Sequence, residues 1–86
     1  MPFYRKRAVT IEAIQFTGDN LEEITEMLGP DLADQQVTQQ INRLVIRTLE
    51  GDMKANVGDW IIRGVADEAY PCRNDVFLRT YEPADA

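Results

Sequence analysis

The sequence has no histidine, no serine and a single cysteine, Cys72. Histidine is the commonest general base and the commonest metal ligand, so its absence excludes the usual acid–base and zinc chemistry. The absence of serine, with only one thiol, leaves few groups for nucleophilic catalysis and excludes an internal disulfide. We therefore predict a protein that binds another molecule without converting it, with no cofactor, no metal site and no catalytic residue.

Basic residues and long apolar runs are also scarce. The chain carries 9 Lys and Arg against 15 Asp and Glu, a formal charge of −6, whereas direct nucleic-acid binding requires an excess of basic groups. Apolar runs such as Leu44-Val45-Ile46 are far shorter than the ~20 residues of a membrane-spanning helix. No apolar stretch follows the basic N-terminus, so no signal peptide is expected. We expect a single domain, residues 1–86, in a reducing cytoplasm and without membrane contact.

The charges are unevenly distributed along the chain. Arg5, Lys6 and Arg7 supply three of the nine basic residues. Residues 12–34 contain no base and seven acids, which are Glu12, Asp19, Glu22, Glu23, Glu26, Asp31 and Asp34. Either the acidic helix matches the basic N-terminal strand inside the fold, or it presents a polar surface to a partner. For the second interpretation the candidate partner contacts are Glu22, Glu23 and Glu26.

The first half of the chain predicts one strand and one helix. Residues 9–16 alternate as in a strand whose outer face becomes apolar toward its end. Residues 20–28 have helical spacing, with one apolar stripe formed by Leu21, Ile24, Met27 and Leu28. Asn20 as N-cap and Glu23 three residues later predict a capping box. Gly29 is a typical C′ residue, and Pro30 is expected to stop the helix.

The second half predicts a β-meander. Residues 31–40 are polar and fit either a loop or the start of a strand. Strands are expected over 41–49, 53–57, 60–65 and 69–73, with a hairpin turn centred on Gly51-Asp52. Pro71 lacks an N–H, so its strand is expected at an edge or a bulge. The expected fold is α+β: a curved antiparallel sheet of about five strands, with one N-terminal-half helix packed on one face and a short C-terminal helical turn from residue 74 or 75.

Two further patterns have a structural and a functional interpretation. Asp52, Asp59, Asp67 and Asp75 recur every seven or eight residues, which suits either a hard-metal cluster or, more simply, Asp residues that hydrogen-bond their own turns. Cys72 is either a small apolar residue or a thiol whose pKa is lowered by Arg73. We favour the structural interpretation of both.

An aromatic and basic group in the second half suggests a ligand pocket. Trp60, Arg63, Tyr70 and Arg73 fall on neighbouring predicted strands, and a ring with a guanidinium suits a planar, anionic ligand such as a nucleotide. Arg47 and Arg5 are the next candidate contacts. On this interpretation Arg63→Ala abolishes small-ligand binding and leaves the fold intact. The alternative is a core tryptophan with exposed arginines.

The most distinctive segments resemble a group of small phage and prophage proteins, mostly uncharacterised. They are Tyr4-Arg5-Lys6-Arg7 with Glu12-Ala13-Ile14-Gln15-Phe16-Thr17-Gly18, then Leu49-Glu50-Gly51, then Val57-Gly58-Asp59-Trp60-Ile61-Ile62-Arg63-Gly64-Val65, and finally Tyr70-Pro71-Cys72, Phe77 and Thr80-Tyr81-Glu82. The resemblance covers the chain except about residues 30–42. Ala69 departs from it, because a larger side chain is expected before Tyr70.

This resemblance implies a phage accessory protein in the host cytoplasm that antagonises host defence by binding. One expectation is a homo-oligomer that sequesters a nucleotide-derived immune signal, which the arginine and aromatic group favours. A second is an acidic inhibitor that mimics nucleic acid and binds a host defence protein, which the charge of −6 favours. A third is a structural or assembly module of a phage, which joins its partner through an exposed strand edge.

Overall fold

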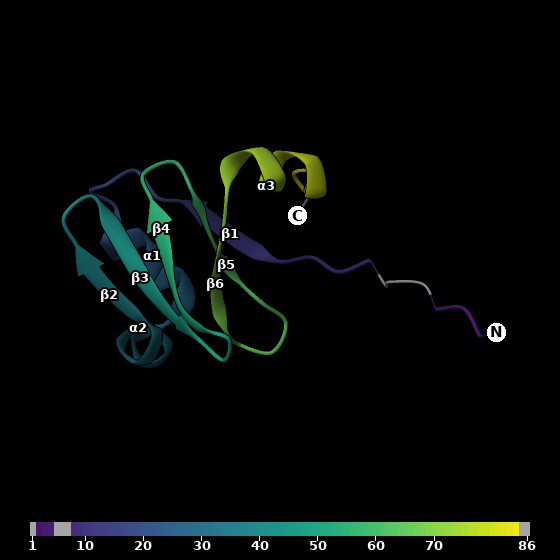
Figure 1. Cartoon of the computed structure of the whole chain (residues 1–86), viewed down its shortest axis with the longest axis horizontal. Coiled ribbons are helices and arrows are strands. Elements are labelled where there is room, and N and C mark those ends of the chain that lie inside the picture. Colours follow the sequence, from purple (N-terminus) through teal and green to yellow (C-terminus); the bar gives the residue numbers. More distant parts are fainter. Residues whose placement is uncertain (1, 5–7, 85–86) are drawn as a thin grey trace.

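The computed structural model describes residues 2–4 and 8–84 and has an α+β fold (Figure 1). In chain order its elements are β1 (Glu12–Gln15), α1 (Leu21–Leu28), α2 (Pro30–Gln36), β2 (Val37–Gln40), β3 (Arg43–Thr48), β4 (Gly51–Asn56), β5 (Trp60–Arg63), β6 (Ala69–Cys72) and α3 (Asn74–Thr80). The α+β class is confirmed. The single five-stranded meander is wrong, because the strands form two antiparallel three-stranded sheets, β1-β5-β6 and β2-β3-β4.

The first sheet joins distant parts of the chain. β1 pairs with β5, so that Glu12 lies opposite Arg63 and Gln15 opposite Trp60. β5 is therefore the central strand, and Ile61 and Ile62, which point to opposite faces, are both fully buried. β6 is an edge strand, as Pro71 predicted.

The second sheet begins in residues 31–40, which fitted either a loop or the start of a strand in the sequence. Residues 31–40 complete α2 and form β2, and the chain reverses at Asn42, whose φ is +60°. The next hairpin turns at Leu49 and Glu50, because Thr48 pairs with Gly51. The turn predicted at Gly51-Asp52 is therefore wrong by two residues.

The predicted helix over 20–28 is confirmed as α1, with Ile24 and Leu28 buried. Gly29 ends it at a φ of +86°, and its N–H donates to the Thr25 carbonyl at 2.8 Å. Pro30 stops α1 and at the same time begins α2, since a proline is well suited to a first helical position.

The capping box and the length of the first strand are corrected. The Asn20 side chain does not cap α1. Its Oδ1 accepts from the Thr17 N–H at 2.8 Å and its Nδ2 donates to Glu23 Oε1 at 3.1 Å. Asn20 thus fixes the turn that precedes the helix. The strand predicted over 9–16 is reduced to β1, although its end is buried as expected, with Phe16 only 1% exposed.

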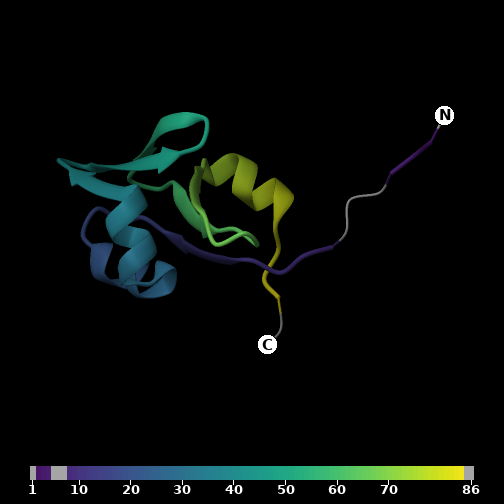
Figure 2. The ribbon, with the colours of Figure 1, turned by 90° about the horizontal axis from the view of Figure 1, so that it is seen from below.

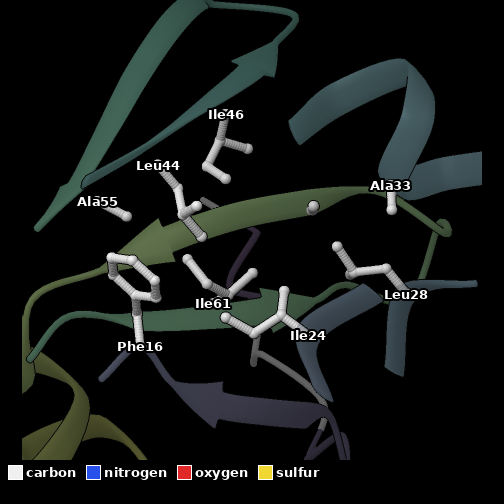
Figure 3. Packing of buried hydrophobic residues seen from close by; sticks show 9 residues of the cluster. Phe16, Ile24, Leu28, Ala33, Leu44, Ile46, Ala55 and Ile61 are labelled. Carbon is white, nitrogen blue, oxygen red and sulfur yellow. The ribbon is translucent and has the colours of Figure 1, made fainter. Parts of the chain in front are cut away.

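One apolar core lies between the two sheets and the first two helices (Figure 3). Its buried residues are Phe16, Ile24, Leu28, Ala33, Leu44, Ile46, Ala55, Ile61 and Ala69. Both sheets and both helices contribute to it, whereas α3 lies apart from α1 and α2 (Figure 2). Burial of these side chains on both sheets holds the sheets against each other without strand pairing between them.

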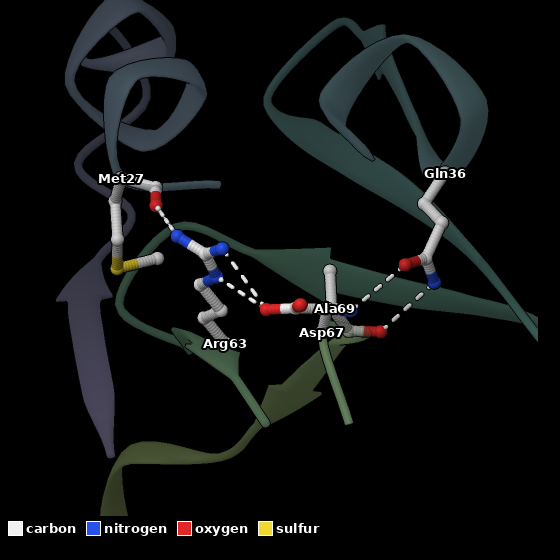
Figure 4. Close-up of polar contacts among 5 residues, drawn as sticks. All are labelled: Met27, Gln36, Arg63, Asp67 and Ala69. Atoms are coloured by element: carbon white, nitrogen blue, oxygen red, sulfur yellow. Dashed lines mark hydrogen bonds and ion pairs between the residues drawn. The ribbon is translucent and has the colours of Figure 1, made fainter. Parts of the chain in front are cut away.

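Gln36, the last residue of α2, joins the two sheets (Figure 4). Its Oε1 accepts from the Ala69 N–H at 2.9 Å, and its Nε2 donates to the carbonyls of Ala69 at 3.1 Å and Arg47 at 2.6 Å. The amide thus takes the place of a neighbouring strand on the outer edge of β6. Pro71, further along that edge, offers no N–H. The edge is therefore closed to a further strand at both positions.

Gln36→Ala is expected to lower the free energy of unfolding by about 2–3 kcal/mol, because it leaves the N–H and C=O of the buried Ala69 unpaired. Urea denaturation measures this change. Gln35→Ala is the matched control: Gln35 is exposed, and its loss should change stability by no more than about 0.5 kcal/mol. Equal stability of the two variants would contradict this role of Gln36.

Candidate functional site

A groove of about 800 Å³ opens where the β3–β4 hairpin, α2 and the start of β6 meet. Apolar side chains form most of its wall, including Leu32, Leu49, Met53, Tyr70 and Pro71. Leu49 is fully exposed and Met53 is 40% exposed. Apolar side chains left in solvent in a concave surface are typical of a binding site.

The charges around this groove are mainly negative. Arg47 is its one base, against Glu50, Glu68 and Asp67, of which Asp67 is paired with Arg63. Arg47 makes no ion pair with any residue that the structure describes. Glu68 Oε2 is buried and has no hydrogen-bond partner among the described residues. A cationic group at this rim is therefore favoured over an anionic one.

Tyr70 contributes a neutral ring to the groove. Its burial raises the pKa of the phenol to about 12, helped by interaction with the hydroxyl of Tyr81 and by the charge of Glu68. Gly64 makes room for this arrangement, since a Cβ at that position would lie 2.9 Å from Tyr70 Cε1 and 2.7 Å from Glu68 Cδ. Tyr70 therefore offers an aromatic face and a hydroxyl without charge at neutral pH.

Trp60 holds α3 in place. Its ring stacks on Phe77 at 4.0 Å between centroids with an angle of 6°, and its Nε1 donates to Asn74 Oδ1 at 2.9 Å. Tyr81 continues the stack at 5.0 Å from Phe77. One face of the tryptophan is therefore covered. The predicted C-terminal helical turn includes Phe77, but no local feature of the sequence predicts the contact between Phe77 and Trp60.

Arg63 lies at the end of β5 and is bonded on two sides (Figure 4). Its Nη1 donates to the Met27 carbonyl at the end of α1, at 3.1 Å. Its Nε and Nη2 donate to Asp67 Oδ1, at 3.2 and 2.9 Å. A cation at a helix C-terminus also stabilises the helix dipole. Arg63 therefore ties β5 to α1, so its removal is expected to lower stability as well as any ligand binding.

Arg73 and Cys72 lie next to each other outside the groove. Arg73 pairs with Asp75 at 2.8 Å, and this hydrogen bond lowers the pKa of the Asp75 carboxyl. Both side chains are exposed, so the pair contributes little to stability. Burial, with the charges of Asp59 and Asp75, raises the pKa of the Cys72 thiol and outweighs the lowering by Arg73. The alternative interpretation, a thiol with a lowered pKa, is therefore wrong, and the structural interpretation that we favoured remains.

The predicted ligand contacts are thus divided among several places. Arg47 and Tyr70 line the groove together. Arg63 lines a separate, smaller cleft of about 280 Å³, while Trp60 and Arg73 lie beside α3. Arg5 lies outside the described residues. Sequence reasoning missed Gln36 and Glu68, because a glutamine in a polar tract and a glutamate in a turn carry no local signal of a groove.

The first two helices carry an exposed acidic surface. We define the acidic helical face as Glu22, Glu23, Glu26, Asp31 and Asp34, all of which are exposed. None of the five pairs with a base that the structure describes. Because α1 and α2 pack against each other, these exposed carboxylates concentrate negative charge on two neighbouring helices.

The four spaced aspartates have local partners or neighbours. Asp59 Oδ2 accepts from the Asn56 N–H at 2.9 Å, Asp67 and Asp75 pair with arginines, and Asp52 lies opposite Arg47 in the hairpin register. Among the described residues, no cluster of three or more acidic or cysteine side chains is suited to hold a metal ion. Nor does any described helix have the length and apolarity needed to cross a membrane.

Comparison with known proteins finds no match: no protein-family model, no curated protein and no solved structure is significantly similar to the chain. The resemblance to phage proteins therefore stays a prediction from the residues quoted above.

Arg63→Ala is expected to lower the free energy of unfolding by about 1–2 kcal/mol, because the Met27 carbonyl loses its charged donor and α1 its link to β5. The control is Arg79→Ala, which removes an exposed arginine on α3 and should change stability by less than about 0.5 kcal/mol. Urea denaturation of both variants measures the difference. If Arg63→Ala is as stable as Arg79→Ala, Arg63 is free to serve as a ligand contact alone.

Proposed function

We propose that this protein is a non-catalytic phage accessory protein that binds a basic host defence protein in the host cytoplasm through its acidic helical face. The observation that carries the proposal is the exposure of all five carboxylates of that face without a described basic partner. The phage context comes from the sequence resemblance.

The physical basis is electrostatic complementarity. A net charge of −6 on 86 residues, concentrated on two packed helices, steers a positively charged surface toward that face. Spaced carboxylates present the same kind of charge as nucleic-acid phosphates, so a protein that binds nucleic acid is the expected class of partner. Such an interaction weakens as salt concentration rises.

Sequestration of a nucleotide-derived signal is the second candidate. Arg47 and Tyr70 support it, because they place a guanidinium without a described ion-pair partner and an aromatic ring in the same groove. The carboxylates of Glu50 and Glu68, which have no described ion-pair partner, oppose a ligand rich in phosphate, and Arg63 and Arg73 already hold acidic partners. We therefore favour the acidic inhibitor, although the arginine and aromatic pattern of the sequence alone favoured the nucleotide-sequestering protein.

Neutralising the α1 part of the face tests the proposal. Glu22→Gln/Glu23→Gln/Glu26→Gln and the control Glu12→Gln/Asp52→Asn/Glu82→Gln each remove three exposed charges, so both change the net charge from −6 to −3. Tagged proteins are recovered from host cells by affinity purification and gel filtration, and the partner is identified by mass spectrometry. A basic partner should co-elute with the parent and the control, and be lost from the α1 variant and at raised salt.

Two results would contradict the proposal: equal retention of the partner by both variants, or a parent protein that holds no host protein. Nucleotide released by heat from the parent, but not from Arg47→Ala, would instead support the second candidate. Thermal unfolding of all variants separates loss of binding from loss of fold.

A further inference from the structure

The N-terminal segment, residues 2–8, has two exposed aromatic side chains followed in the sequence by three basic residues. Phe3 is 93% exposed and Tyr4 is 94% exposed. Arg5, Lys6 and Arg7 follow in the sequence. Residues 2–4 lie far from the sheets (Figures 1 and 2). Two adjacent exposed aromatic side chains leave a large apolar area in contact with water unless another surface covers them.

The groove between the two sheets has the complementary properties. Leu49 and Met53 present apolar surface, and Glu50, Asp67 and Glu68 surround it with negative charge. We propose that the N-terminal segment of one copy binds in the groove of a second copy, so that the protein forms a dimer by reciprocal exchange of these segments.

The segment and the groove have complementary chemistry. Phe3 and Tyr4 supply rings for the apolar wall, where Leu49 is fully exposed. Arg5, Lys6 and Arg7 supply positive charge for the carboxylates of Glu50 and Glu68, which have no described ion-pair partner. Glu68 Oε2 is buried and has no described hydrogen-bond partner. A new donor at this carboxylate would therefore be stabilising.

The dimensions fit this exchange. Seven extended residues reach about 23 Å. The molecule measures 27 and 23 Å along its two shorter axes, so a segment of this length can cross the neighbour's groove. Reciprocal exchange makes the contact the same in both directions, which gives a closed dimer rather than an open chain. The groove borders α2 but none of its lining residues belongs to the acidic helical face, so this inference does not depend on the proposed function.

Sedimentation velocity of the full chain over a range of concentrations tests the dimer. Leu49→Lys places a positive charge in the groove, and Phe3→Ala/Tyr4→Ala removes the rings; each changes only exposed side chains, so the fold should persist. Either change should raise the dimer dissociation constant by about tenfold or more. Leu78→Lys adds the same charge at a side chain that is 64% exposed on α3, outside the groove, and should leave the dimer intact.

Carbodiimide coupling of amines to carboxylates identifies which copy fills the groove. In a mixture of unlabelled and ¹⁵N-labelled protein, Lys6 should couple to Glu50, Asp67 or Glu68 between a light and a heavy chain. A parent that is monomeric at every concentration would overturn the inference, as would a dimer unaffected by either Leu49→Lys or Phe3→Ala/Tyr4→Ala. Lys6 couplings confined to chains of one isotope would overturn it too, because the segment would then occupy its own groove.

Discussion

The side-chain amide of Gln36 is the contact on which the arrangement of the two sheets depends. It pairs with both backbone groups of Ala69 and with the Arg47 carbonyl, so one side chain connects α2, β3 and β6. With Pro71 further along, it closes the outer edge of β6 to a neighbouring strand. The sheets therefore pack through apolar side chains without merging into one, and the groove opens where they diverge.

The distribution of charge has the same structural origin. Arg63 and Arg73 are used inside the molecule or against neighbouring acids. The carboxylates of the acidic helical face have no such described partner. Two of the six described bases are thus engaged by the fold itself, whereas the five carboxylates of the acidic helical face remain exposed to solvent, which suits a basic partner better than an anionic ligand.

Local features of the sequence were sufficient to predict α1, the edge position of β6 and the α+β class. Helical spacing, Gly29 and Pro71 each determine structure within a few residues. The pairing of β1 with β5 was not readable, because it joins segments more than forty residues apart and leaves no local signal. α2 was missed because Pro30 was taken as a stop only. The candidate site was predicted in part: Arg47 and Tyr70 meet at the groove, but Trp60 turns to Phe77, which depends on where α3 docks.

Amide hydrogen exchange at Ala69 tests the central claim most directly. If the Gln36 amide replaces a strand, the Ala69 N–H exchanges as slowly as that of Ile62 in the middle of the first sheet, because both open only when the core unfolds. Exchange at Ala69 as fast as at the exposed Ala66 in the β5–β6 loop would show that the edge of β6 is open, and would contradict the account.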